Sequence, residues 1–235
     1  MSALAALAAD PPRAALFFDL DGVLAPIVDA PEDARVPVET RHELARLSER
    51  YGLVACVTGR ASAFAREAVG VAGMRYVGQH GLELDPDAAA WGERIHAFAT
   101  RTGWGDIEVK SLAVAFHYRR AADRDAARRQ AEDVAAAALA EGFRTKWGRY
   151  LVEVVPPLDA SKGTAVKTLL AESGLRHALY AGDDVTDLDG FRALDGLEVA
   201  VRIAVTSSEG PTELAARADL VVNSTWELLD LLREL

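Results

Sequence analysis

The chain has 235 residues, of which 50% are hydrophobic and 26% are charged, so it can bury one large core or two smaller ones. Its formal net charge of −10 argues against a nucleic-acid partner, because proteins that bind nucleic acid normally present a basic face. Cys56 is the single cysteine, which excludes an internal disulfide bond and a thiolate metal cluster.

The first ten residues, "MSALAALAAD", are rich in alanine and are followed by Pro11 and Pro12. This segment is too short to span a membrane and lacks the basic flank of a signal peptide. We therefore expect a frayed lead-in segment, a cytoplasmic protein and no membrane contact.

Short apolar runs alternate with longer amphipathic segments along most of the remaining chain. The apolar runs predict strands at 14–20, 52–58, 74–80, 177–183, 196–204 and 219–223. The amphipathic segments predict helices at 37–50, 61–69, 161–173, 187–194, 211–217 and 225–234. Nearly continuous apolar strands that alternate with helices are typical of a parallel sheet covered on both faces. The predicted fold class is therefore α/β, with a doubly wound, Rossmann-like parallel sheet as its core.

The middle of the chain has a different pattern. Its predicted elements are a strand at 107–120 broken by polar residues, a helix at about 122–141, a hairpin turn at Trp147-Gly148-Arg149 and a strand at 151–155. Proline-containing segments bound this region on both sides. We predict a small inserted α+β domain at 85–157, between two parts of the core at 11–84 and 158–235.

Two acids follow the first predicted strand, in "LFFDLDG". Asp19 and Asp21 are separated by one residue, so on an extended strand their carboxylates point the same way. A bend at Gly22 could hold one as a nucleophile and place the other over the same ligand. The alternative is an ordinary solvated strand end.

Thr58 and Lys162 are further polar groups next to predicted elements. Thr58, in "VTGR", stands at a helix N-terminus suited to an anion, or is simply a helix cap. Lys162, in "DASKGTA", opens a helix, where a cation is unfavourable unless something anionic faces it. The alternative interpretation of Lys162 is a solvated lysine in the first turn of the helix.

Asp183, Asp184 and Asp187 lie within five positions after another apolar strand. Mutual repulsion makes such clustering costly without a cation, and hard oxygen ligands suit Mg²⁺. A capped, solvated turn is the alternative.

These motifs occur in the order D-x-D-G-V, T-G-R, K-G and G-D-D-x-x-D, which resembles the haloacid dehalogenase (HAD) superfamily of phosphotransferases. The resemblance implies that Asp19 attacks phosphorus and forms an aspartyl phosphate. Asp21 would protonate the leaving oxygen and later deprotonate the attacking water, which marks a hydrolase of phosphate esters. Thr58 and Lys162 would hold phosphoryl oxygens.

The same resemblance implies a Mg²⁺ site. Its ligands would be Asp19, the backbone carbonyl of Asp21, and Asp183. Asp184 and Asp187 would be a further ligand or supporting groups, and the sequence does not rank them.

The inserted segment would be a cap domain, and its details are similar to those of the trehalose-6-phosphate phosphatase family. "GQHGLEL" (78–84), "IEVKSLAVAFHYR" (107–119) and "GDDVTDLDGF" (182–191) carry this similarity. Val23, Ala113 and Val155 depart from the family's usual pattern. The substrate-binding residues implied are Arg60, His80, Gly81, Lys110, His117, Arg119 and Glu153.

Each of these residues also has a structural interpretation. Lys110 and Arg119 could be solvated strand residues, Glu153 a cross-strand partner of one of them, and His117 a half-buried histidine with its polar groups satisfied. Arg60 could assist the phosphate or pair with Glu67 on its helix.

The resemblance predicts hydrolysis of trehalose 6-phosphate to trehalose and phosphate, by a protein for which a monomer is favoured. The alternatives are a related phosphatase of sucrose, mannosylglycerate or hexose phosphate, and a non-catalytic regulator that binds a sugar phosphate. The intact acid pair, Lys162 and Asp183 count against the regulator.

Overall fold

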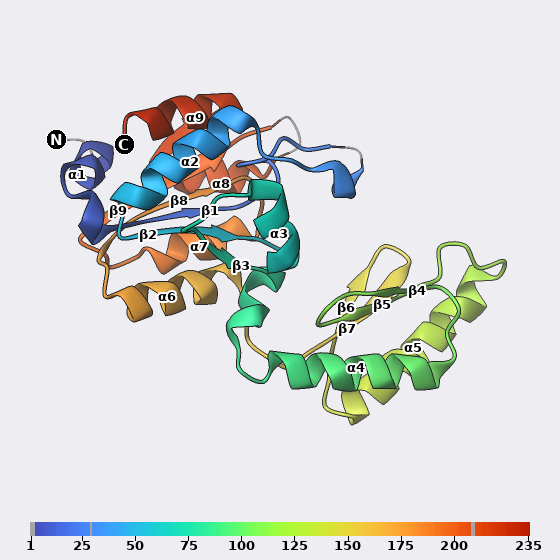
Figure 1. Cartoon of the computed structure of the whole chain (residues 1–235). Coiled ribbons are helices and arrows are strands. Elements are labelled where there is room, and N and C mark those ends of the chain that lie inside the picture. The colour runs from blue at the N-terminus through green and yellow to red at the C-terminus, as the bar shows by residue number, and fades with distance from the viewer. Residues whose placement is uncertain (1–2, 29, 208–209) are drawn as a thin grey trace. The chain divides into compact units, whose positions relative to one another are not determined.

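The computed structural model describes residues 3–28, 30–207 and 210–235. The chain forms two compact units (Figure 1). We call Met1–Gly81 together with Ala160–Leu235 the core unit, and Leu82–Asp159 the inserted unit. Among the helices that the structure describes, none combines the length and the apolar character needed to cross a membrane.

The core unit is built on a six-stranded parallel sheet with the order β10-β9-β8-β1-β2-β3. Its strands are β1 (Ala14–Phe18), β2 (Leu53–Val57), β3 (Arg75–Val77), β8 (His177–Gly182), β9 (Val199–Val205) and β10 (Leu220–Val222). Strand β1 is central and completely buried, as expected for a continuous apolar run inside a parallel sheet. The chain runs outward in opposite directions from β1, so a topological switch point lies between β1 and β8. The predicted α/β fold class is confirmed.

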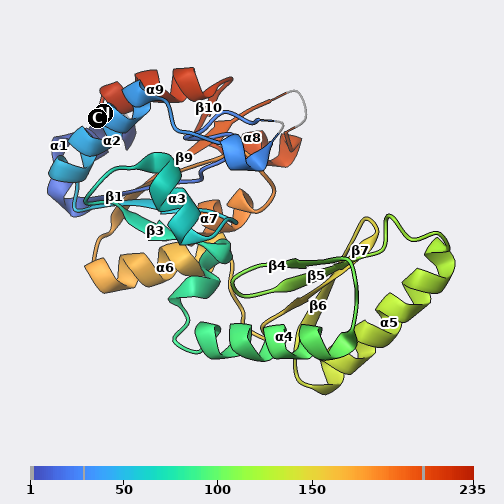
Figure 2. The same ribbon diagram turned by 45° about the vertical axis from the view of Figure 1, so that its right-hand side comes forward.

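Helices cover both faces of this sheet (Figures 1 and 2). They are α1 (Ala3–Ala9), α2 (Val38–Arg50), α3 (Ser62–Val69), α6 (Lys162–Ser173), α7 (Asp187–Ala193), α8 (Thr212–Arg217) and α9 (Thr225–Arg233). Helices α2 and α9 lie side by side on one face, and α6 and α7 pack together on the other. Successive β1 side chains serve both layers: Leu16 and Phe18 join the cluster beneath α2 and α9, and Phe17 faces the opposite way. Short 3-10 helices occur at η1 (Pro11–Arg13), η2 (Pro31–Asp33) and η3 (Gln79–Leu84).

The expected frayed segment at the N-terminus is wrong for the residues that the structure describes there. Residues 3–9 form helix α1, which packs against β9. Leu4 and Leu7 are three positions apart and therefore share one helix face, which is buried in the core cluster. Alanine's high helix propensity supports the helix, and burial of the two leucines anchors it. The first two residues lie outside the described part.

The inserted unit is an antiparallel sheet with helices on one face (Figure 2). Its strands, in the order β4-β5-β7-β6, are β4 (Ile107–Val109), β5 (Val114–His117), β6 (Arg144–Gly148) and β7 (Leu151–Val155). Its helices are α4 (Ala88–Thr102) and α5 (Arg124–Ala140). Phe98 from α4 packs edge-on against Phe116 and Phe143, in a hydrophobic cluster that belongs to this unit alone.

Three details of the inserted unit differ from the prediction. Helix α4 has no predicted counterpart, although its buried Ile95 and Phe98 follow helical spacing. The predicted strand at 107–120 is a hairpin, in which the N–H of Lys110 donates to the carbonyl of Ala113 (2.9 Å). The second hairpin turns at Arg149-Tyr150, one to two residues later than predicted, because Gly148 still pairs with Leu151. Tyr150 takes the left-handed turn conformation there (φ 65°) and packs edge-on against Tyr118.

Candidate active site

The polar groups predicted to act together follow neighbouring strands of the core sheet. Asp19 and Asp21 follow β1, Thr58 follows β2, and Asp183 follows β8. Parallel strands end at the same edge of a sheet, so these side chains are gathered at the carboxyl edge near the switch point. Lys162 is the first residue of α6, which Ser161 caps through reciprocal hydrogen bonds with Thr164 (3.2 and 2.8 Å).

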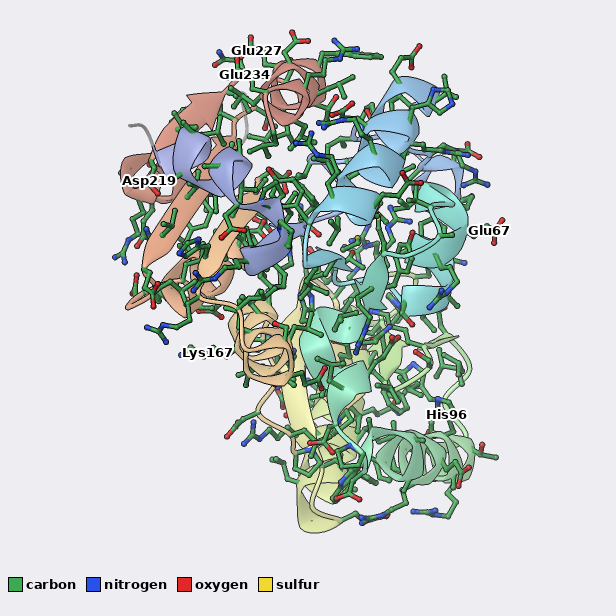
Figure 3. All side chains as sticks on the ribbon, turned by 60° about the vertical axis from the view of Figure 1, so that its left-hand side comes forward. Glu67, His96, Lys167, Asp219, Glu227 and Glu234 are labelled. Carbon is green, nitrogen blue, oxygen red and sulfur yellow. The ribbon has the colours of Figure 1, made fainter. Side chains whose placement is uncertain are left out.

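The Lys162 ammonium lies between two carboxylates. Its Nζ atom is 2.7 Å from Oδ2 of Asp19 and 2.7 Å from Oδ1 of Asp187, and the lysine is 2% exposed. Burial alone would lower the pKa of Lys162, but Asp19 and Asp187 outweigh it and raise the pKa above its usual range. Lys167, on the same helix, instead points into solvent (Figure 3). The unfavourable position of Lys162 at a helix N-terminus is thus offset by anions that face it.

Asp19 is held from two sides and is almost inaccessible to solvent. Its Oδ1 accepts a 2.7 Å hydrogen bond from the N–H of Leu20, and its Oδ2 faces Lys162. Burial raises the pKa of Asp19 to about 7, against the opposing effect of Lys162. Asp183 shows the same behaviour, with a pKa raised to about 8 first by burial and then by Asp19 and Asp187.

These acids fit a divalent cation. One carboxylate oxygen from each of Asp19, Asp183 and Asp187 lies within 4.8 Å of the other two. With Lys162 as the cation beside them, the ionised cluster carries two excess negative charges. Hard carboxylate oxygens are the ligands that Mg²⁺ takes, and the charge of the cation would offset both the burial and the mutual repulsion that raise the pKa values of Asp19 and Asp183. The structure therefore provides a suitable metal site.

The three acids after β8 differ in their surroundings. Asp187 is fully buried, and both of its oxygens accept hydrogen bonds. Asp184 is exposed and accepts from the N–H of Val185 (2.7 Å). Asp183 lies against Gly22, where a Cβ atom would collide with its carboxylate, and Gly22 has φ +76°. The glycine after the acid pair thus makes room for Asp183 and supplies the left-handed bend.

Asp21 has a partner that the sequence did not suggest. Arg60 donates from Nε to Oδ2 of Asp21 (2.7 Å) and from Nη2 to Oδ1 (2.6 Å), in a two-pronged ion pair. The guanidinium lies over the Phe64 ring, 4.4 Å from its centroid. Glu67, the partner considered for Arg60 from the sequence, points outward from α3 (Figure 3).

Thr58, His80 and Gly81 lie beside these groups in the core unit. Thr58 is buried, and its Oγ1 accepts from the N–H of Arg60 (3.2 Å). The N–H of His80 donates to the carbonyl of Thr58 (2.9 Å), and its ring packs so closely on Gly59 that a Cβ there would lie 2.7 Å from Cε1. At Gly81 (φ +98°), a Cβ would meet the start of α6 at 3.0 Å. Because glycine has no side chain, the backbone at Gly81 can lie this close to the start of α6.

The structure brings two pairs together on the sheet of the inserted unit. Lys110 Nζ lies 2.7 Å from Oε1 of Glu153, and His117 Nε2 lies 3.2 Å from Oε2 of Glu108. Ala115 pairs in register with both Glu108 and Glu153, so the two glutamates lie on one face of the sheet. Arg119, beyond the end of β5, is exposed. The sequence did not indicate the contact between Glu108 and His117, because it depends on this pairing register.

The doubly wound sheet, the acids at its carboxyl edge and the inserted unit define a HAD-like protein. A solved HAD-like hydrolase from Bacteroides thetaiotaomicron shares this fold, with a TM-score of 0.61 over 94% of this chain and 98% of its own at 13% identity. Residues 17–224 match the family model for trehalose-phosphatase. The chain belongs to the trehalose-phosphatase family, and the resemblance predicted from its motifs is confirmed.

Individual relatives agree with this assignment. The trehalose-phosphate phosphatase of Mycobacterium avium (strain 104) is 37% identical over 206 residues, which cover 77% of this chain and 51% of the relative. The "Probable trehalose-phosphate phosphatase" of Sinorhizobium fredii is 35% identical, over 88% of this chain and 84% of its own. Trehalose-6-phosphate phosphatase from Aspergillus fumigatus (crystal form 3) gives a TM-score of 0.67 at 26% identity, over 94% and 92% of the two chains. The chain spans about half the length of the mycobacterial relatives.

Proposed function

We propose that the protein hydrolyses trehalose 6-phosphate to trehalose and phosphate, with Mg²⁺ as the cation of the acidic site. The observation that carries this proposal is the Asp19 carboxylate, fixed at the end of β1 between the Leu20 N–H and the Lys162 ammonium. Membership of the trehalose-phosphatase family supports the choice of substrate. A cytoplasmic location and a monomeric state stay predictions from the sequence.

In the first step, an oxygen of Asp19 forms a bond to phosphorus while the bond between phosphorus and the sugar oxygen breaks. Lys162 lies 2.7 Å from Asp19, so its positive charge offsets the repulsion between the nucleophile and the phosphoryl group. Asp21 gives its proton to the departing sugar oxygen, and the product is free trehalose plus an aspartyl phosphate.

In the second step, Asp21 takes a proton from water as the water oxygen attacks phosphorus. The bond between phosphorus and Asp19 breaks, which releases phosphate and restores both acids. In the absence of substrate the ionised Asp21 carboxylate is paired with Arg60, so Asp21 leaves Arg60 and takes up a proton from solvent before it acts as the acid of the first step. Thr58, on the neighbouring strand end, would hold a phosphoryl oxygen.

Asp19 and Asp183 would hold the Mg²⁺ ion, together with the backbone carbonyl of Asp21. When bound, the ion neutralises charge that develops on the phosphoryl oxygens. Asp187 is a weaker choice of ligand because its lone pairs already accept four hydrogen bonds.

The substrate's sugar hydroxyls need donors and acceptors at several positions. The Lys110–Glu153 and His117–Glu108 pairs offer both kinds of group on the sheet of the inserted unit. We assign Lys110, His117, Arg119 and Glu153 to the sugar by family resemblance. Arg60, His80 and Gly81 are assigned to the substrate on the same ground.

The deciding experiment measures phosphate release with Mg²⁺ from trehalose 6-phosphate, sucrose phosphate, mannosylglycerate phosphate and glucose 6-phosphate. We expect the highest kcat/KM for trehalose 6-phosphate, and no release by the Asp19→Asn variant. If the protein hydrolyses another compound of this panel faster than trehalose 6-phosphate, that compound would replace trehalose 6-phosphate as the proposed substrate. Full activity of Asp19→Asn would overturn the mechanism.

A further inference from the structure

Tyr180 is a buried polar residue of the core sheet that lies outside the four sequence motifs. It belongs to β8, and its side chain has no exposed surface. Its hydroxyl donates a 2.7 Å hydrogen bond to Oδ1 of Asp187. Burial, followed by the charge of Asp187, raises the pKa of Tyr180 well above its usual value, so the hydroxyl keeps its proton and remains a donor.

The hydroxyl completes the hydrogen bonding of Asp187. Oδ1 of Asp187 accepts from Tyr180 and from Lys162 Nζ, at 2.7 Å each. Oδ2 accepts from the N–H groups of Asp183 and Asp184, at 3.0 Å each. Four donors match the four lone-pair positions of a carboxylate, so this side chain is fixed in both place and orientation.

Three glycines make room for this network. A Cβ at Gly190 would collide with the Tyr180 ring, and a Cβ at Gly182 would collide with the Asp187 side chain. A Cβ at Gly163, next to Lys162, would collide with the backbone of α7. These glycines do not have positive φ values, so what the positions require is space. The sequence thus allows β8, α6 and α7 to close tightly around Asp187.

We propose that Tyr180 is a positioning residue for the reaction: its hydroxyl fixes Asp187, which in turn holds the Lys162 ammonium against Oδ2 of Asp19. The chain of contacts runs through buried side chains, from Tyr180 to Asp187, Lys162 and Asp19. Without the tyrosine donor, Asp187 can rotate toward Lys162 and draw the ammonium away from the nucleophile. The consequence for turnover rests on the proposed function, because it assumes that Asp19 and Lys162 act on a phosphate ester.

The variant Tyr180→Phe removes the hydroxyl and keeps the ring, which packs edge-on against Phe191 (centroids 6.0 Å apart). Its matched control is Tyr76→Phe, on the edge strand β3. Tyr76 is also buried, and its hydroxyl donates a 2.8 Å hydrogen bond to the carbonyl of Val71. Both variants lose a buried hydrogen bond that a tyrosine hydroxyl donates, and Tyr76→Phe also loses the 3.3 Å bond that this hydroxyl accepts from the N–H of Val71. Of these bonds, the one made by Tyr180 leads to Lys162.

Two measurements separate positioning from general stability. The first is the kcat and KM for p-nitrophenyl phosphate and for trehalose 6-phosphate with Mg²⁺. The second is hydrogen exchange of the Lys162 ammonium, followed by ¹⁵N NMR without substrate. For Tyr180→Phe we expect kcat to fall about tenfold with KM within about twofold, and ammonium exchange to accelerate about tenfold. Tyr76→Phe should change neither quantity.

The proposal is overturned if kcat and ammonium exchange of Tyr180→Phe match those of Tyr76→Phe. If the unmodified protein hydrolyses p-nitrophenyl phosphate but not trehalose 6-phosphate, the substrate assignment fails, and the aryl phosphate still tests Tyr180. If it hydrolyses neither, the proposed function fails, and unchanged exchange of the Lys162 ammonium would still refute the positioning role.

Discussion

Replacing Asp183 by asparagine is expected to stabilise the metal-free protein at alkaline pH while it abolishes phosphate release. The Asp183 carboxylate lies in a cluster with Asp19 and Asp187, in which one oxygen of each residue is within 4.8 Å of the others. Burial and these two neighbours raise its pKa to about 8. Asparagine keeps the shape of the side chain and removes its charge, so the repulsion disappears.

The direction in which the stability changes with pH follows from the number of protons that the folded and unfolded states bind. The pKa of Asp183 rises from 3.8 in the unfolded chain to about 8 in the folded protein. Between these values the folded state binds the extra proton, so stability falls as the pH rises through this window. Without solvent screening the difference corresponds to about 6 kcal/mol. Because the side chain is partly exposed, we expect screening to reduce it to about 2 kcal/mol.

Urea unfolding in EDTA at pH 5 and pH 8 measures this effect. At pH 8 the free energy of unfolding of Asp183→Asn should exceed that of the unmodified protein by about 2 kcal/mol, and at pH 5 the gain should be less than half as large. The control Asp184→Asn, at an exposed neighbour, should stay within about 0.5 kcal/mol. Saturating Mg²⁺ should stabilise the unmodified protein more than Asp183→Asn. Equal stabilities of the unmodified protein and Asp183→Asn at pH 8 would refute the repulsion described here.

Three other substitutions test the remaining parts of the site. Lys162→Met should lower kcat by about 10³-fold or more, because the nucleophile loses its buried cation. The control Lys167→Met, on the exposed face of the same helix, should keep full phosphate release. Glu153→Ala should lower kcat/KM for trehalose 6-phosphate about tenfold or more and leave that for p-nitrophenyl phosphate within about twofold; equal losses on both would make Glu153 structural. Gly22→Ala should destabilise the protein by about 2 kcal/mol or more in urea unfolding, because it adds a collision to an unfavourable φ. Gly174→Ala has a similar φ (+70°) with nothing near its Cβ, so it should cost about 1 kcal/mol, and equal costs for the two glycines would contradict the collision.

The edge of the core sheet could be predicted from local patterns alone. Apolar runs located the strands, and the parallel topology then required the groups after β1, β2 and β8 to meet. Asp19, Thr58 and Asp183 needed no knowledge of side-chain rotamers to be placed at one edge. For Lys162 the sequence offered a different argument, because a cation in the first turn of a helix is unfavourable unless an anion faces it, although a solvated lysine was the open alternative.

Other parts of the site depend on contacts that no local pattern encodes. The Arg60–Asp21 pair joins side chains 39 positions apart and depends on two rotamers. The Lys110–Glu153 pair requires the register of β4, β5 and β7, which the sequence did not predict. Tyr180 looks like any aromatic residue of a buried strand until its hydroxyl is seen to reach Asp187. The sequence therefore predicted which residues lie at the site better than it predicted which side chains contact one another.

The contacts of Asp19 and those of Asp21 are built differently, and the difference suits the proposed chemistry. Lys162 and Asp187 are buried, Asp187 accepts four hydrogen bonds and Lys162 contacts two carboxylates, so neither can change partners without losing short contacts. In contrast, the side chains of Asp21 and Arg60 are 31% and 23% exposed, so water can replace either partner of this ion pair. A nucleophile needs a constant electrostatic environment through both steps, whereas the acid that gives and then takes a proton must exchange partners between them. The nucleophile Asp19 is thus held by a rigid buried network, whereas the acid Asp21 is held by an ion pair that can exchange.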